Sequence, residues 1–179
     1  ALGWSAWRAR SVPDFPRREA RFLKGAQLER ALQAAAERLE ADPEDLKALV
    51  DSGVLHFQKG REGYADAINA LDDARNLGAL DDRIFYYLGV MYQEEGLFPF
   101  AVREYQRFLR NRPRDEEARL LLAKILFQQG RHEEARAHYR RSESLRPKDP
   151  LVTENLALCL VALKRDGEAA AAFEALAAL

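Results

Sequence analysis

The sequence has little of what most enzymes, disulfide-stapled domains and membrane spans require. Its 179 residues include one cysteine, Cys159, seven prolines and ten glycines. One cysteine excludes an intramolecular disulfide and a cysteine-rich metal site. Val, Ile and Thr are scarce, which disfavours a fold built from β-strands. No apolar run approaches the roughly 20 residues of a transmembrane helix. The net charge of −1 gives the chain as a whole no attraction to nucleic acid or membranes.

Alanine and leucine dominate what is present, with 30 and 26 residues respectively. Charged residues make up 32% of the chain and hydrophobic residues 47%, a balance that excludes disorder along the whole length. The chain is long enough to bury a sizeable core. This composition predicts a helical protein.

The charges are segregated along the chain. Residues 1–24 carry a net charge of +4, residues 40–95 carry −8 and residues 103–148 carry +6. One interpretation is a set of solvated surfaces in a protein that uses Arg in place of Lys. The other is a dipolar molecule whose halves attract oppositely charged surfaces.

An internal repeat with a period of 34 residues organises the chain. Gly96 recurs as Gly130, and an alanine follows each of these glycines after five residues. The same step relates the aromatic and turn positions, namely Ala101 to Ala135 and Ala169, Tyr105 to Tyr139 and Phe173, and Pro113 to Pro147.

Small residues in this pattern predict where two antiparallel helices cross. Gly89, Ala123 and Ala157 would face Ala101, Ala135 and Ala169, so that the backbones can approach, while the large residues Leu71, Tyr105, Tyr139 and Phe173 fill the space toward the next repeat. Pro113 and Pro147 would end the second helix of each pair. A single repeat cannot close its own core, so neighbours must stack.

This pattern resembles the tetratricopeptide repeat, in which a helix with L-G-x2-Y is followed by a turn and a helix with A-x3-F. The clearest copy is Phe85, Leu88-Gly89, Tyr92, Gly96, Ala101, Tyr105, Phe108 and Pro113. The resemblance covers residues 45–179 as four repeats, about 45–81, 82–115, 116–149 and 150–179. It implies an all-α, right-handed superhelical solenoid of antiparallel helix pairs.

Two repeats depart from the pattern. In the first, Gly53 keeps its position, but Ala67 and Leu71 fit only after an insertion of two residues, which we expect the turn at residues 60–64 to absorb. Gly78 is expected to end that repeat as a helix C-cap in place of proline. In the last repeat, Lys164 and Gly167 replace the usual placement of the turn glycine.

Residues 16–44 are expected to form a degenerate repeat or a capping helix, because an amphipathic stripe runs along Leu28, Ala31, Leu32, Ala35 and Leu39. Residues 1–15 are expected to be extended. Trp4 and Trp7 precede an arginine cluster, which suits a membrane-interface anchor whose span has been removed. The alternative is that both rings pack on the array or in its groove.

The ends of the sequence also predict that it is a fragment or a processed product of a longer protein. The Ala-, Leu- and Arg-rich composition suggests a bacterial source. We expect a cytoplasmic location, or an association with the inner membrane that faces the cytoplasm, with the periplasm as the alternative. Membrane contact is expected only through a missing N-terminal anchor.

Catalytic chemistry has no support in the sequence. His56, His132 and His138 have no metal-site spacing, and no nucleotide-binding loop or nucleophile motif is present. Cys159 lies between two leucines, which predicts a buried and inert thiol. We therefore expect no enzyme activity, no cofactor and no metal.

The first helices of such an array are expected to line a concave groove that binds a protein or peptide partner. Helical spacing places ten residues on that face: Val54, Phe57, Tyr86, Val90, Gln93, Leu120, Lys124, Phe127, Glu154 and Leu158. One family subclass grips a C-terminal carboxylate with Lys, Asn and Arg. Val50, Tyr86, Leu120 and Glu154 stand at those positions here, which disfavours that ligand. Acidic residues interrupt the arginines of the second helices, which disfavours nucleic acid.

The predicted function is a non-catalytic scaffold or adaptor that binds a partner segment in the groove. Two alternatives stay open. The chain could be a regulatory or accessory arm of an enzyme or membrane assembly whose functional domain lies outside this sequence, or it could be a scaffold that assembles with itself.

Overall fold

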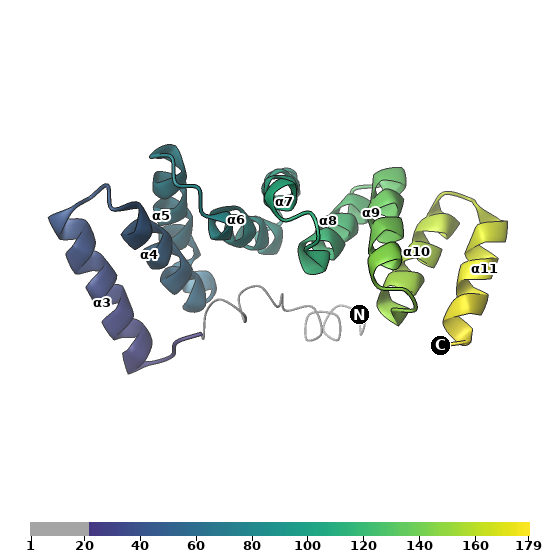
Figure 1. Ribbon diagram of the computed structural model, residues 1–179, viewed down its shortest axis with the longest axis horizontal. Helices are drawn as coiled ribbons and strands as arrows, with labels where there is room; N and C mark the ends of the chain where they lie inside the picture. The colour runs from purple at the N-terminus through teal and green to yellow at the C-terminus, as the bar shows by residue number, and fades with distance from the viewer. Residues whose placement is uncertain (1–21) are drawn as a thin grey trace. The chain divides into compact units, whose positions relative to one another are not determined.

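Helices make up all the regular secondary structure of the described residues. The computed structural model describes residues 22–179, which form nine α-helices, one short 3-10 helix and no strand (Figure 1). The all-α prediction is therefore confirmed for this range, whereas the handedness of the superhelix stays a prediction. The segment predicted as extended, residues 1–15, and the first part of the 16–44 segment lie outside the described residues. The described chain divides into two compact units, residues 22–97 and 98–179.

The first unit contains four α-helices. They are α3 (Ala26–Ala41), α4 (Leu46–Gln58), α5 (Tyr64–Asn76) and α6 (Asp82–Glu94), with a 3-10 turn at Arg61–Gly63. Helix α4 is central, because it packs against α3, α5 and α6. The predicted helix in 16–44 is thus present as α3, and Leu28 and Ala35 of its apolar stripe are buried.

The second unit contains five α-helices, each packed against the next. They are α7 (Phe98–Asn111), α8 (Glu116–Gln128), α9 (His132–Leu145), α10 (Pro150–Ala162) and α11 (Asp166–Ala177). Gly130 makes the turn between α8 and α9 as predicted, and Tyr105 and Tyr139 of the aromatic column lie on α7 and α9. The division of residues 45–179 into four repeats stays a prediction, since the 82–115 repeat includes residues of both units.

An aspartate begins each of the four helices predicted as first helices. Its carboxylate accepts a hydrogen bond from a main-chain N–H of the first turn, which satisfies a donor that has no partner within the helix. These N-caps are Asp45 on α4, Asp81 on α6, Asp115 on α8 and Asp149 on α10. The last three are spaced by the 34-residue period, and the first pair is two residues wider.

The two extra residues lie in the turn between α4 and α5, as predicted. Five residues, 59–63, join these helices, and the 3-10 helix at Arg61–Gly63 accommodates them. Three residues, 129–131, join α8 to α9. The predicted C-cap is also present: Gly78 has φ 91°, and the Ala79 N–H donates to the Ala74 carbonyl at 2.9 Å.

The crossing of α4 and α5 depends on the missing side chain of Gly53. A Cβ at Gly53 would lie 2.5 Å from Cγ of Leu71 and 3.2 Å from the carbonyl oxygen of Ala67. The equivalent small residues of the second unit are also buried, namely Ala123, Ala135, Ala157 and Ala169. Within each unit, small residues therefore occupy the tightest places. Gly89 and Ala101 belong to different units, so their predicted contact stays a prediction.

The last repeat makes its turn without glycine. After α8, Gly130 has φ 75°, and the following N–H, of Arg131, donates to the Leu126 carbonyl at 2.9 Å. After α10, Lys164 has φ 57°, and Arg165 donates to the Leu160 carbonyl at 2.9 Å. The same left-handed cap therefore forms on a residue with a Cβ, at a conformational cost of about 1 kcal/mol.

The close approach at Gly53 predicts that Gly53→Ala destabilises the protein. The gain in helix propensity is about 1 kcal/mol, whereas overpacking against Leu71 costs about 1–3 kcal/mol. We expect the free energy of unfolding in urea to fall by about 1 kcal/mol. Gly167→Ala in α11 is the matched control, because no atom lies within 4 Å of a Cβ there. It should stabilise by about 0.5 kcal/mol. An unchanged or more stable Gly53→Ala protein would contradict the close approach.

Candidate partner-binding surfaces

The ten residues predicted for the groove lie on four helices. Val54 and Phe57 are on α4, and Tyr86, Val90 and Gln93 are on α6. The second unit contributes Leu120, Lys124 and Phe127 from α8 and Glu154 and Leu158 from α10. They form one candidate surface on each unit.

Three of these residues are buried. Tyr86 is fully buried, and Val54 and Leu120 are nearly so. Tyr86, which helical spacing placed on the groove face, is therefore not exposed there, and its ring lies edge-on to Tyr87 at 5.4 Å between centroids. A position that faces outward on an isolated helix pair becomes part of the core once neighbouring helices stack. The other seven are exposed or half-buried, and their role in binding stays a prediction.

An aromatic cluster holds the first unit together around Phe57. Its ring stacks parallel to Tyr64 of α5 at 5.6 Å and meets Tyr87 of α6 at 4.8 Å and 56°. Phe22, which precedes α3, lies 6.4 Å from the same ring. The Tyr64 hydroxyl donates to Oε2 of Glu94 at 2.7 Å. Phe57 therefore joins three parts of the unit, as offset and tilted ring pairs do in protein cores.

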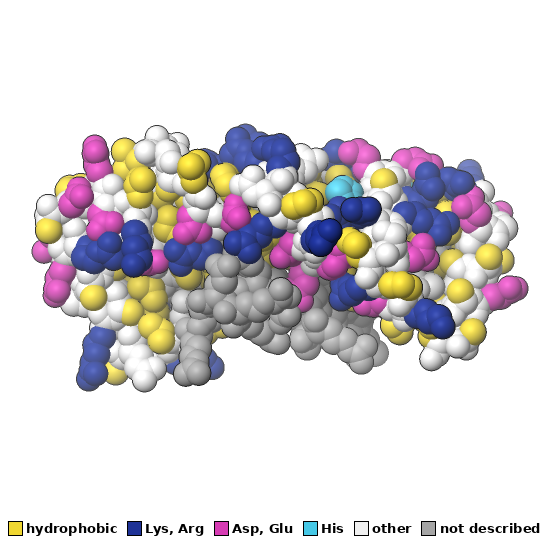
Figure 2. Space-filling view, viewed as in Figure 1, with side chains coloured by type: hydrophobic (Ala, Val, Ile, Leu, Met, Phe, Trp, Pro, Cys, Tyr) yellow, Lys and Arg dark blue, Asp and Glu magenta, His cyan; other side chains and the backbone are white. Residues whose placement is uncertain are grey.

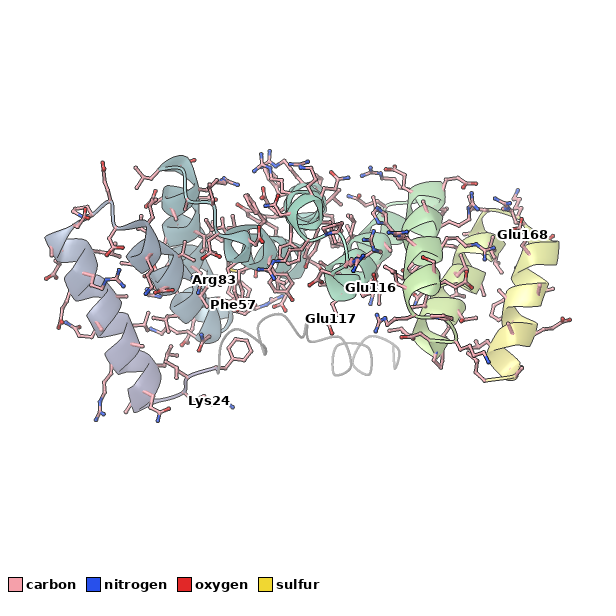
Figure 3. All side chains as sticks on the ribbon, in the orientation of Figure 1. Lys24, Phe57, Arg83, Glu116, Glu117 and Glu168 are labelled. Atoms are coloured by element: carbon pink, nitrogen blue, oxygen red, sulfur yellow. The ribbon has the colours of Figure 1, made fainter. Side chains whose placement is uncertain are left out.

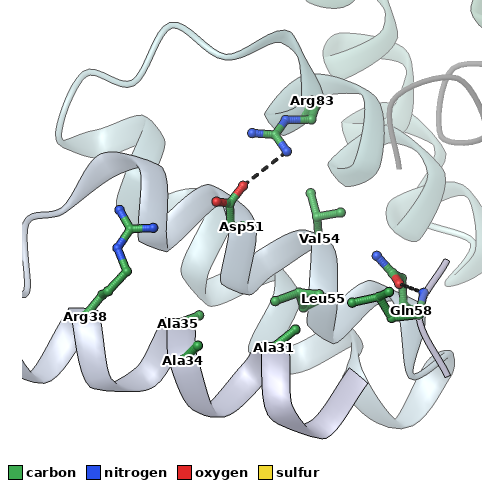
Figure 4. Close-up of a pocket in the computed structure, with 10 residues that line it drawn as sticks. Ala31, Ala34, Ala35, Arg38, Asp51, Val54, Leu55, Gln58 and Arg83 are labelled. Carbon is green, nitrogen blue, oxygen red and sulfur yellow. Dashed lines mark hydrogen bonds and ion pairs between the residues drawn. The ribbon is translucent and has the colours of Figure 1, made fainter. Parts of the chain in front are cut away.

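A hollow of about 400 Å³ lies between α3, α4 and α6 (Figure 4). Its walls are mostly apolar and its α3 side consists of alanines, whose small side chains leave the space open. The residues that line it are Leu23, Ala31, Ala34, Ala35, Arg38, Asp51, Val54, Leu55, Gln58 and Arg83. This volume and lining are typical of a site for a small ligand or for the side chains of a peptide.

Paired charges form the polar rim of the hollow. Arg83 of α6 donates from Nη1 to Asp51 of α4 at 3.2 Å and from Nη2 to Asp81 at 2.8 Å. The hydrogen bond that Arg83 donates to the Asp81 carboxylate raises the pKa of Arg83. Arg38 of α3 donates to Asp45 at 2.6 Å. Both guanidinium groups are thus neutralised by carboxylates, so the rim presents donors and acceptors without a large net charge.

Ala31 and Ala35 line the hollow from the predicted apolar stripe, and among the ten predicted groove residues Val54 alone lines it. Asp51, Leu55 and Gln58 share its face of α4 at helical spacing, so the register could have indicated them. The partnership of Arg83 with Asp51 could not be read from the register, because each has other charged neighbours. Ala34 of α3 lies outside the apolar stripe of this degenerate segment, so the pattern did not indicate it.

The candidate surface of the second unit combines apolar and charged side chains. Leu158 and Val161 of α10 are 44% and 49% exposed. Phe127 of α8 packs against His132 at 4.9 Å. Burial lowers the pKa of Lys124 to about 8.

Ion pairs offset much of the basic surface of the second unit. Figure 2 shows Lys and Arg side chains gathered over α7, the helix that carries Arg103, Arg107 and Arg110. On α9, Arg136 pairs with Glu133 at 2.8 Å. Glu168, labelled in Figure 3 at the start of α11, lies 3.5 Å from Arg140 of α9. These carboxylates agree with the prediction that acidic residues interrupt a nucleic-acid surface.

The histidines and the cysteine are dispersed. His56 is on α4, whereas His132 and His138 are on α9, and burial lowers the pKa of His56 and of His138. Cys159 is fully buried, and burial raises the pKa of its thiol to about 11. Across residues 22–179, no cluster of three or more His, Cys, Asp or Glu could hold a metal ion. Within that range, too, no helix has the length and apolar character of a membrane span.

These features are those of a helical repeat protein, in which antiparallel helix pairs stack and leave exposed surfaces large enough to contact a partner. Residues 92–150 match the family model of the tetratricopeptide repeat. This stretch is thus similar to the tetratricopeptide repeat, the family that the sequence pattern resembles.

Solved structures share the fold. The crystal structure of MamA protein is 21% identical with a TM-score of 0.73, over 91% of this chain and 85% of that one. YrrB, described as a TPR protein with an unusual peptide-binding site, is 23% identical with a TM-score of 0.75, over 84% of this chain and 76% of that one. MamA AMB-1 is 20% identical with a TM-score of 0.77, over 86% and 82%. The search of curated proteins returned no match.

The lowered pKa of Lys124 predicts a pH-dependent stability. The folded-state pKa of about 8 lies below the unfolded value of about 10.4, so the unfolded state binds more protons between these values. The free energy of unfolding should therefore rise from pH 8 to pH 10, by about 1 kcal/mol or less for a half-buried group. Urea unfolding at pH 7, 8, 9 and 10 measures it.

Two variants isolate this contribution. Lys124→Arg keeps its charge at these pH values and should lack the rise, whereas Lys124→Met removes the burial penalty and should be more stable than the wild type at pH 7. Parallel stability curves for all three proteins would contradict the assignment.

Proposed function

We propose that this chain is a non-catalytic scaffold that binds a segment of a partner protein. The hollow between α3, α4 and α6 is the observation that carries the proposal. It combines apolar walls with Asp51, Gln58 and Arg83, which can accept and donate hydrogen bonds. A peptide offers the matching groups, because an apolar side chain can enter the hollow while its main chain bonds to the rim.

The size of the hollow indicates what it can hold. A volume of about 400 Å³ accommodates one or two side chains but not a folded element. The ligand is therefore a short, extended segment with an apolar anchor. Leu158 and Val161 form a separate exposed apolar surface on the second unit. The peptide-binding site for which YrrB is described supports this function by analogy of fold.

A substitution at Ala34 tests the proposal. Ala34 is exposed and lines the hollow, so Ala34→Phe should fill it while leaving the core intact. Peptides are first selected from a displayed library on the wild-type protein, and their affinities are then measured by fluorescence anisotropy. We expect Ala34→Phe to weaken binding about tenfold or more, as loss of an anchor pocket does.

Ala36→Phe is the matched control, since Ala36 is also exposed on α3 but does not line the hollow. It should bind as the wild type does. Equal affinities of all three proteins would mean that the hollow is not the binding site, and a library that yields no binder would remove support for peptide binding altogether.

Self-assembly is a second candidate, favoured by the charge of the two units. Residues 22–97 carry eight Lys or Arg and fifteen Asp or Glu, whereas residues 98–179 carry fifteen and twelve. The first unit of one copy would therefore attract the second unit of another. Such head-to-tail contacts do not close on themselves and would give open oligomers.

Sedimentation velocity at low and high salt tests this candidate. Oligomers should form at about 0.05 M salt and dissociate at about 0.5 M, where screening is strong. Glu62→Lys with Asp73→Lys should prevent association, and mixing with an Arg110→Glu, Arg114→Glu protein should restore it. All four residues are exposed. A monomer at every salt and protein concentration would exclude electrostatic self-assembly.

A further inference from the structure

The residues that enter α3 already contact one end of the hollow. Residues 22–24 are not helical, and Leu23 lines the hollow. The main-chain N–H of Leu23 donates to Oε1 of Gln58 at 2.7 Å, the contact drawn in Figure 4. The Phe22 ring lies 6.4 Å from Phe57 and 39° from its plane. One end of the hollow therefore contacts a non-helical piece of the chain itself.

These contacts are of the kind that an external peptide makes. A side-chain amide that accepts from a main-chain N–H recognises an extended backbone whatever its sequence, and the aromatic and aliphatic side chains add selectivity. Phe22 is 38% exposed, so it is only partly covered by the unit. Gly25, with φ 53°, joins residues 22–24 to α3 in a backbone conformation that favours glycine.

We propose that Phe22 and Leu23 act as a built-in ligand that a partner must displace. Their chemistry then defines the partner segment: an extended peptide in which an aromatic residue precedes an aliphatic one. The aromatic ring lies 6.4 Å from Phe57, the following N–H bonds to Gln58, and the aliphatic side chain lines the alanine-walled hollow. This inference rests on the proposed function and adds to it both a ligand motif and a regulation of access.

The tethering of Phe22 and Leu23 to their own site determines how much they weaken the binding of an external peptide. A short segment joined to its own site has an effective concentration of about 1 mM. If the same segment binds as a free peptide with a Kd of about 0.1 mM, the built-in copy occupies the site about ten times as often as it leaves it. An external peptide then binds about tenfold more weakly than it would to an open site.

The test uses a fluorescent peptide of residues 18–27, Arg-Glu-Ala-Arg-Phe-Leu-Lys-Gly-Ala-Gln, added to the full chain. Phe22→Ala with Leu23→Ala opens the site, and we expect this protein to bind the peptide about tenfold more tightly than the wild type. Lys24→Ala is the matched control, because Lys24 is exposed and adjacent. It should bind as weakly as the wild type.

Adding Gln58→Ala to the opened protein should reverse the gain, and a peptide with alanine at both the Phe and Leu positions should not bind. Equal binding to the wild-type and opened proteins, or equal binding of the two peptides, would overturn the proposal. Circular dichroism of each variant verifies that the helices remain.

Hydrogen exchange in the wild-type chain gives a second readout that needs no variant. A library-selected peptide that displaces Phe22 and Leu23 should accelerate exchange of the Leu23 amide, because its bond to Gln58 is lost. Unchanged exchange at saturation would also overturn the proposal. If Ala34→Phe still weakens the selected peptides in that case, the hollow remains the binding site and only the built-in ligand is wrong.

Discussion

The structure depends on the distance at which antiparallel helices can cross. At Gly53 the backbone of α4 comes so close to α5 that a single added carbon would meet Leu71 and the Ala67 carbonyl. The small residues at the equivalent positions of the second unit, Ala123 and Ala157, are fully buried. Leu71, Tyr105 and Tyr139 are fully or almost fully buried, and Leu71 lies against Gly53 within its own helix pair. A single repeat cannot close its own core, so neighbouring repeats must stack.

The sequence was sufficient for the features that repeat. A 34-residue period located the helices, the turns and the two-residue insertion, because small residues and left-handed caps are required at fixed places in each copy. It was insufficient for features that depend on which elements become neighbours. Tyr86 lies on the expected face of α6 but is buried, and the alanines of α3 form a wall only because α4 packs beside them. Helical register gives the direction of a side chain, whereas burial depends on everything that lies in that direction.

The candidate site arises where the repeat is least regular. Helix α3 belongs to the degenerate segment, and its alanines leave a space that larger side chains would fill. The opposite wall comes from α4, whose register is regular, and Arg83 of α6 joins it through Asp51. The rim pairs its charges internally, so it offers hydrogen bonds without strong attraction to ions. A regular scaffold with one irregular edge can therefore give a local pocket without any loss of packing elsewhere.

The two extra residues between α4 and α5 have a consequence for how such a chain can change by duplication or loss of repeats. The N-cap aspartates Asp81, Asp115 and Asp149 are spaced equally. Recombination between the coding segments of these repeats would therefore remove or add 34 residues and rejoin the helices in register. The repeat that begins at Asp45 is longer, and among the described residues it alone contains a 3-10 turn. An exchange that joins its first helix to the second helix of another repeat would discard the turn that brings Gly53 opposite Ala67. The later repeats can therefore exchange helices with one another, whereas the first repeat can be gained or lost only as a complete helix pair with its turn.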